Sequence, residues 1–129
     1  MSNVLVVDDE VEVCNLLKSV LELELKCQVS LAHDGHEAYQ KLKQIKFDLI
    51  ITDFKMPVMD GAALISAIKT TDTLSKDATI FLVSGHIENT QNGPDIIKDV
   101  LFFDKPFNVK QLIVNARLAL GASKRKKIA

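Results

Sequence analysis

Short apolar runs alternate along this chain with segments in which apolar residues recur every three or four positions. Unbroken runs rich in β-branched residues are typical of parallel strands buried on both faces, and the second spacing is typical of amphipathic helices. The alternation predicts an α/β fold in which βαβ units build one parallel sheet covered on both faces. The expected strands cover residues 4–7, 28–32, 47–52, 79–83 and 100–103.

Helices are predicted after each of these strands. The first ends near Leu25, and the second and third follow the turns at Asp34-Gly35 and Asp60-Gly61. The segment 89–94 holds poor helix formers and ends in Gly-Pro, so the fourth helix is expected to be short or irregular. Gly121 is read as the stop signal of the last helix.

The chain length of 129 residues and the 47% hydrophobic content fit one domain, expected over residues 1–121. Residues 122–129 form a basic tail, in which the run Lys124–Lys127 is read as solvated and disordered, with a linker to a longer protein or a contact with an anionic surface as the alternatives. Whether the chain works alone or is a fragment stays open.

Charge and cysteine content exclude several classes of protein. The 16 basic and 17 acidic residues nearly cancel, so we expect no direct nucleic-acid binding. Neither a secretory signal nor a membrane span is recognisable, and a cytoplasmic location is expected. Cys14 and Cys27 lie among apolar residues and are read as reduced core cysteines.

Polar and charged side chains stand where four of the expected strands end. Asp8 and Asp9 follow the first strand, Asp53 the third, Ser84 the fourth and Lys105 the fifth. In open α/β sheets, ligands bind beyond the carboxyl ends of the strands. These side chains are therefore expected to converge on one site.

Three carboxylates brought together repel one another unless a proton or a cation neutralises them. Oxygen ligands without histidine or cysteine favour a hard ion, and Mg²⁺ is typically held by one or two carboxylates, waters and phosphate. A carboxylate such as Asp53 can attack phosphorus to form an acyl phosphate when charge on the transferring oxygens is neutralised. Mg²⁺ on one side and Lys105 with Ser84 on the other would meet that need.

The chain resembles a receiver domain of the bacterial two-component response regulators. The match covers Val4 to Leu120, and its motifs occur in the family's order. The segments that carry the resemblance are Val6–Glu10, Leu49–Gly61, Val83–Gly85 and Lys105–Phe107. The resemblance implies a flavodoxin-like doubly wound five-stranded parallel sheet with strand order 2-1-3-4-5.

The resemblance also implies roles for the site residues. Asp53 would be the phosphoacceptor, Asp9 a direct Mg²⁺ ligand, Asp8 a ligand partly through water, and the backbone carbonyl of Lys55 a third ligand. Ser84 and Lys105 would contact the phosphoryl oxygens, and the Lys105-Pro106 bond would be cis. By the same resemblance, a sensor histidine kinase or a phosphotransfer protein supplies the phosphoryl group.

The family usually carries a switch aromatic three positions before the lysine, which here is Phe102. Strand side chains alternate, so Phe102 and Phe103 are expected to face opposite ways and only one can be the switch. Phosphorylation would draw Ser84 inward and repack Phe102, changing the partner-binding surface of the fourth helix, fifth strand and last helix. The domain would be a signalling switch that turns over no external substrate.

Each of these residues also has a simpler interpretation. Asp8-Asp9-Glu10 could cap the first helix, Ser84 could be a turn residue and Lys105 a solvated lysine. Phe102 could be a core aromatic, and His86 is read as a bystander.

Three rival functions differ in what they require. Aspartate-nucleophile phosphatases place an acid two residues after the nucleophile, where this chain has Lys55. A flavodoxin-like binder needs a phosphate-cradling loop after the first strand, where the acidic segment 8–10 of this chain would repel the phosphate. A receiver acting only as a constitutive interaction module remains the serious alternative.

Overall fold

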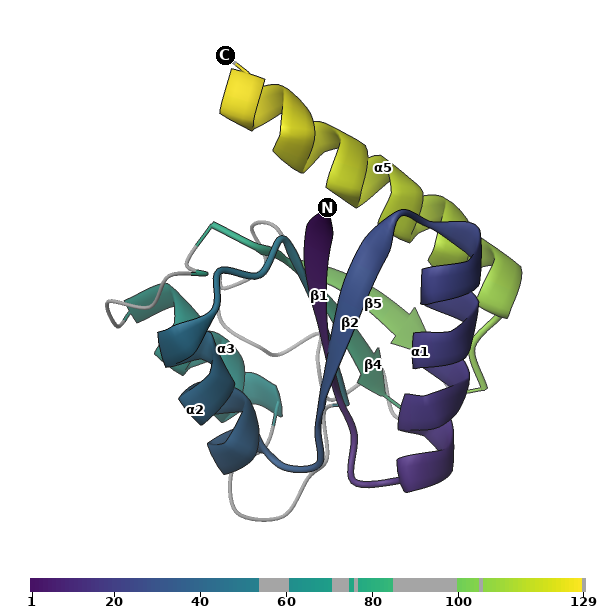
Figure 1. Ribbon diagram of the computed structural model, residues 1–129. Coiled ribbons are helices and arrows are strands. Elements are labelled where there is room, and N and C mark those ends of the chain that lie inside the picture. Colours follow the sequence, from purple (N-terminus) through teal and green to yellow (C-terminus); the bar gives the residue numbers. More distant parts are fainter. Residues whose placement is uncertain (54–60, 71–74, 76, 85–99, 105, 129) are drawn as a thin grey trace.

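Five parallel strands form one sheet in the order β2-β1-β3-β4-β5, as expected (Figure 1). The computed structural model describes residues 1–53, 61–70, 75, 77–84, 100–104 and 106–128. Its strands are β1 (Ser2–Val7), β2 (Cys27–Ala32), β3 (Leu49–Asp53), β4 (Thr79–Ser84) and β5 (Val100–Asp104). The order reverses between β1 and β3, and such a switch point is where ligands bind in folds of this class.

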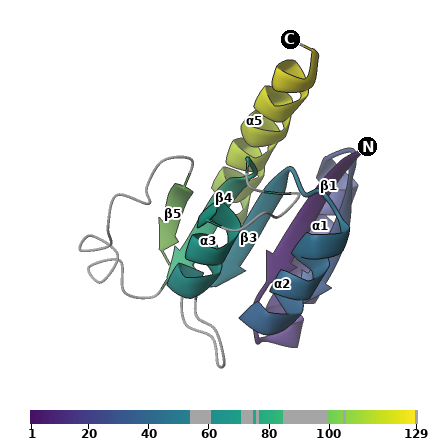
Figure 2. The ribbon, with the colours of Figure 1, turned by 90° about the vertical axis from the view of Figure 1, so that its left-hand side faces the viewer.

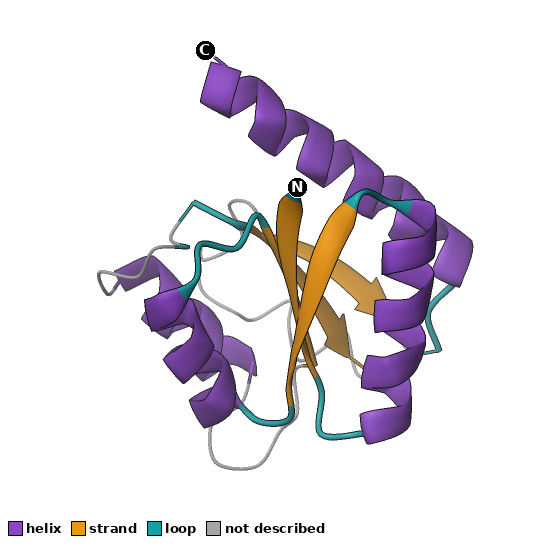
Figure 3. Ribbon diagram, in the orientation of Figure 1, coloured by secondary structure: helices purple, strands orange, loops and turns teal. Residues whose placement is uncertain are grey.

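Helices cover both faces of the sheet (Figures 1 and 3). They are α1 (Val11–Glu24), α2 (Gly35–Gln44), α3 (Gly61–Thr70) and α5 (Val109–Ile128). Figure 2 shows α2 and α3 side by side on one face, and α1 and α5 lie on the other. The fourth helix expected near residues 89–94 lies outside the described residues. Within the described part of the chain, no helix combines the length and the apolar character needed to cross a membrane.

The core consists of two layers, one on each face of the sheet. On β1, Val4 and Val6 pack into the layer under α1 and α5, while Leu5 and Val7 pack into the layer under α2 and α3. All four side chains are buried. This burial on both sides explains why the strand reads as an unbroken apolar run rather than an alternating one.

Polar contacts fix the amino-terminal edge of the sheet. The Asn3 amide donates to the buried Asp48 carboxylate at 3.0 Å, and the Asp48 amide donates to the Asn3 carbonyl at 2.8 Å. The Phe47 amide donates to the buried Ser75 hydroxyl at 2.7 Å. These bonds set the start of β3 against β1, which determines how the two strands are aligned where they end.

The last helix is longer than the sequence predicted. It continues through Gly121 to Ile128, so the reading of Gly121 as a stop signal and of the following basic run as disordered was wrong. A glycine costs a helix only about 1 kcal/mol relative to alanine, and the residues beyond it include good helix formers. The final turns of α5 project past the sheet (Figures 1 and 2).

Candidate functional site

The carboxyl ends of four strands meet at one edge of the sheet. Val7 pairs with Thr52, so Asp8 and Asp53 occupy the next position on two neighbouring strands. Asp53 pairs with Val83, and Ser84 pairs with Asp104 on β5. The strand register thus places Asp8, Asp53 and the backbone of Ser84 at the same edge of the sheet. Lys55, His86 and Lys105 lie outside the described residues.

Three consecutive carboxylates form an acidic group at the end of β1. Ligand oxygens of Asp8, Asp9 and Glu10 all lie within 4.8 Å of one another. Asp8 is buried, whereas Asp9 and Glu10 are exposed to solvent. Glu10 was not assigned to the metal site from the sequence, although its position directly after the two aspartates was the signal. An all-oxygen donor set of this kind fits a hard divalent cation such as Mg²⁺.

The same three residues form the entry to α1. Asp8 Oδ1 accepts a hydrogen bond from the Glu10 amide at 2.9 Å, which orders the turn between strand and helix. Glu10 occupies the N-cap position, yet its side chain makes no capping hydrogen bond. The Glu10 side chain therefore does not cap the helix, and the Asp9 and Glu10 residues are both exposed.

A buried thiol lies behind this turn. Cys14 Sγ donates to the Asp8 carbonyl at 3.3 Å and lies 3.9 Å from both the Ala32 carbonyl and His33 Nδ1. The Asp8 amide donates to the same Ala32 carbonyl at 3.1 Å. Burial, followed by the negative charge of Asp8, raises the pKa of Cys14 to about 11, so the thiol stays protonated and able to donate.

Both cysteines are free and buried, as expected from the sequence. Cys27 lies at the start of β2, where its Sγ donates to the Leu21 carbonyl at 3.5 Å. It is paired in register with Ser2, at the opposite edge of the sheet from the acidic group. The two thiols are alike in burial but differ in position relative to the site.

Asp53 closes β3 and is itself buried, with 8% of its surface exposed. Thr52, which is completely buried, donates from Oγ1 to the Asp53 carbonyl at 3.1 Å. The Asp53 carboxylate thus lies at the carboxyl end of a buried strand, largely shielded from bulk water.

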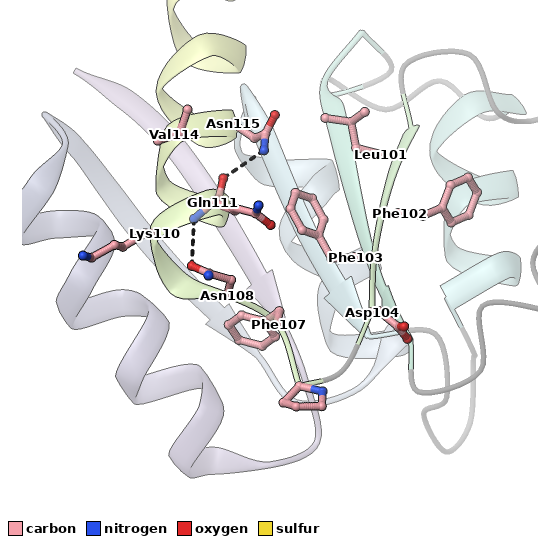
Figure 4. A pocket seen from close by; sticks show the side chains of 11 residues that line it. Leu101, Phe102, Phe103, Asp104, Phe107, Asn108, Lys110, Gln111, Val114 and Asn115 are labelled. Carbon is pink, nitrogen blue, oxygen red and sulfur yellow. Dashed lines mark hydrogen bonds between the residues drawn. The ribbon is translucent and has the colours of Figure 1, made fainter.

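Next to the site, β5 and α5 enclose a hollow of about 700 Å³ (Figure 4). Phe103 faces α5 and packs against Phe81, with ring centroids 4.9 Å apart, while Phe102 points into the layer on the other face. The predicted opposite orientation of the two phenylalanines is confirmed. Leu101 and Val114 line the hollow and are 44% and 52% exposed.

Residues 4–117 match the family described as response regulator receiver domain. The chain is 30% identical over 125 residues to the transcriptional regulatory protein TrcR of Mycobacterium tuberculosis, covering 93% of this chain and 46% of that protein. It spans about half the length of the curated relatives it matches first.

Solved structures resemble the chain over nearly its whole length. The chemotaxis response regulator CheY4 of Vibrio cholerae is 29% identical, with a TM-score of 0.81 over 92% of this chain and 98% of that one. The response regulator protein TrrA of Thermotoga maritima, solved in complex with Mg²⁺-BeF, is 28% identical, with a TM-score of 0.77 over 92% of this chain and 99% of that one.

Proposed function

Because this chain belongs to the family of response regulator receiver domains, which are phosphoacceptor signalling domains of two-component systems, we propose that Asp53 is the residue that accepts the phosphoryl group. The observation that carries this proposal is the strand register. It sets a buried carboxylate at the end of β3 beside the acidic end of β1. The acceptor oxygen and the ligands of a charge-neutralising ion then share one edge of the sheet.

Receiver domains bind Mg²⁺ at an acidic pocket, and the carboxylates here fit that ion. We propose that Asp8, Asp9 and Asp53, with the backbone carbonyl of Lys55, hold it. When bound, Mg²⁺ supplies positive charge to the transferring phosphoryl oxygens. In its absence the carboxylates repel each other, and Asp8 depends on the Glu10 amide for part of its stabilisation.

Receiver domains interact with histidine kinases or phosphotransfer proteins, and we propose a phosphohistidine of such a partner as the donor. An Asp53 carboxylate oxygen forms the new P–O bond while the P–N bond to the imidazole breaks, and the departing ring takes up a proton. Ser84 and Lys105 contact the phosphoryl oxygens. Water later cleaves the P–O bond and restores the carboxylate, so the domain assists its own dephosphorylation.

Receiver domains act as signalling switches. We infer further that this site turns over no external phosphate ester, because the position two residues after Asp53 holds Lys55 and not an acid that could protonate a leaving group. The lysine argues against a phosphatase role on chemical grounds.

Phosphorylation would change how the face formed by the fourth helix, β5 and α5 binds a partner protein. Ser84, the last residue of β4, pairs with β5, so a movement of Ser84 toward the phosphoryl group acts directly on that strand. Phe102, two residues before the paired Asp104, is half-buried and would repack. The hollow with exposed Leu101 and Val114 offers the apolar surface for an unidentified protein partner.

The test is incubation of the chain with a small phosphodonor and Mg²⁺, followed by intact-mass measurement. Wild type is expected to gain one phosphoryl group, and Asp53→Asn none. Asp77→Asn is the matched control, because Asp77 is an exposed aspartate just before β4 begins, and this variant should react as wild type does. Failure of wild type to gain mass would favour a constitutive interaction module.

A further inference from the structure

The backbone carbonyls of two site aspartates are each bound by a completely buried side-chain donor. Cys14 Sγ donates to the Asp8 carbonyl at 3.3 Å, and Thr52 Oγ1 donates to the Asp53 carbonyl at 3.1 Å. Both donors are fully shielded from solvent. Neither has a place in the phosphoryl chemistry, and the sequence predicted no contact of either with the site.

We propose that Cys14 and Thr52 are positioning residues that hold the Asp8 and Asp53 backbones in the geometry that binds Mg²⁺. This inference rests on the proposed function of the site. Metal ligands keep their orientation through hydrogen bonds from a second layer of groups. Here that layer acts on the main chain rather than on the carboxylates themselves.

The surroundings of Cys14 show why its donor matters. The end of β1 is bound to the end of β2 through the Asp8 amide and the Ala32 carbonyl, and the thiol lies between these two strand ends. It is also in the first turn of α1, four residues after Glu10. One side chain thus connects the helix to the turn that carries all three acidic residues, and its loss frees that turn to relax under carboxylate repulsion.

Thr52 plays the corresponding part on β3. Its side chain is completely buried, and the following residue, Asp53, is the last residue of the strand. The hydroxyl bond therefore ties the last peptide group of the strand to a side chain that cannot move into solvent. Valine has nearly the same shape without the donor, which makes the contribution of the hydrogen bond separable from packing.

The experiment is an NMR titration of the full 129-residue chain with MgCl₂, following the Asp9 and Glu10 amides. Cys14→Ala and Thr52→Val, which remove the donors, should each weaken Mg²⁺ binding roughly three- to tenfold, at or below the range seen for outer-layer partners of metal ligands. Cys14→Ser and Thr52→Ser, which keep a hydroxyl donor, should stay within about twofold of wild type.

Cys27→Ala is the matched control, because it removes another buried thiol, which lies far from the site. It should lose stability comparably to Cys14→Ala in urea unfolding yet bind Mg²⁺ like wild type. Three results would each overturn the inference. They are an unchanged Mg²⁺ affinity in Cys14→Ala and Thr52→Val, a Mg²⁺ affinity of the serine variants as low as that expected for these two, and an equal loss of Mg²⁺ affinity in Cys27→Ala. If one donor variant weakens binding and the other does not, the assignment of the second is wrong. A wild-type chain that takes up no Mg²⁺ would instead overturn the proposed function, and this inference with it.

Discussion

Asp8 combines burial with two neighbouring negative charges. Its side chain is 4% exposed, and the oxygens of Asp9 and Glu10 lie within 4.8 Å. Without a cation this arrangement opposes folding, because a buried charge is poorly solvated and like charges repel. We therefore propose that these carboxylates lower the stability of the metal-free chain and that binding of a divalent ion at this site restores it.

Asp8→Asn tests whether the charge of Asp8 destabilises the metal-free chain. Asparagine keeps an Oδ1 acceptor for the Glu10 amide and removes the charge. In metal-free buffer of low ionic strength the variant should have a free energy of unfolding higher by on the order of 1 kcal/mol, measured by urea unfolding. Added Mg²⁺ should stabilise wild type and have little effect on the variant. A variant less stable than wild type without metal would show that carboxylate repulsion does not govern the stability of the metal-free chain.

The buried thiols predict an alkaline limit to stability. Burial, and then the charge of Glu22, raise the pKa of Cys27 above its ordinary value of 9.0. The folded chain therefore holds this proton more tightly than the unfolded chain. The thiol's contribution to stability is complete below about pH 9 and is lost as the pH rises through the raised pKa of the folded state.

Urea unfolding of wild type and Cys27→Ala on both sides of about pH 9 measures this contribution. Wild type should lose stability more steeply than the variant, because the Cys27 thiol ionises more readily in the unfolded chain than in the folded one, whereas Cys14 contributes equally to both proteins. Parallel pH profiles for the two proteins would contradict the assignment.

The acidic site residues could be predicted from the sequence because each follows an apolar run, and parallel strands share one carboxyl edge. The expectation that Asp8, Asp9 and Asp53 lie at one edge needed no more than that, whereas their individual roles were taken from the family resemblance and stay predictions. The contacts of Cys14 and Thr52 could not be predicted in the same way. They depend on how closely α1 returns to β1 and on the rotamer of one hydroxyl, which the hydrophobic pattern does not determine.

At the scale of elements, the end of α5 differs from the end that the sequence pattern predicted. A glycine near the end of an amphipathic segment favours helix termination, but nothing lies within 4 Å of a Cβ added at Gly121. The helix passes through it because the residues on either side tolerate helical backbone. Termination signals are weak compared with the sum of propensities around them.

Gly121→Ala should therefore stabilise the chain by about 0.5–1 kcal/mol, since alanine lowers the backbone entropy lost in a helix and meets no neighbour. Chemical unfolding followed by circular dichroism gives the value. Gly121→Pro should have the opposite effect and reduce the helical signal. Destabilisation by alanine would mean that α5 ends at Gly121 in solution.

The strands and their order were predicted more securely than the helix ends. β1 and β3 are buried on both faces, so their sequences are continuous apolar runs. Such short runs are typical of buried parallel strands, which is why these two strands were predicted securely. The order β2-β1-β3-β4-β5 came from the family resemblance and not from the pattern, because hydrophobic periodicity carries no information on which strands are neighbours.

At the scale of the whole molecule, the proposed acceptor and the proposed partner face are joined through two strands. Asp53 pairs with Val83 on β4, and Ser84 pairs with Asp104 on β5, a strand whose residues 101–104 line the hollow. A phosphoryl group can shift this surface only by the difference in its interactions with the two states, typically about 1–3 kcal/mol of coupling.

Addition of beryllofluoride with Mg²⁺, a phosphoryl mimic, should therefore shift the amide resonances of Leu101, Phe102 and Gln111. The amides of α2 on the far face should change little, which provides the internal control. Asp53→Asn should abolish the shifts. Changes confined to the acidic group would place the output surface elsewhere.

The most direct test of the central claim is to locate the phosphoryl group after reaction with a small phosphodonor and Mg²⁺. Borohydride reduction converts an aspartyl phosphate into a stable alcohol, and peptide mass spectrometry then identifies the modified residue. The account predicts a single reduced position, Asp53. Modification of Asp8, Asp9 or any other residue, or no modification in the presence of Mg²⁺, would contradict it.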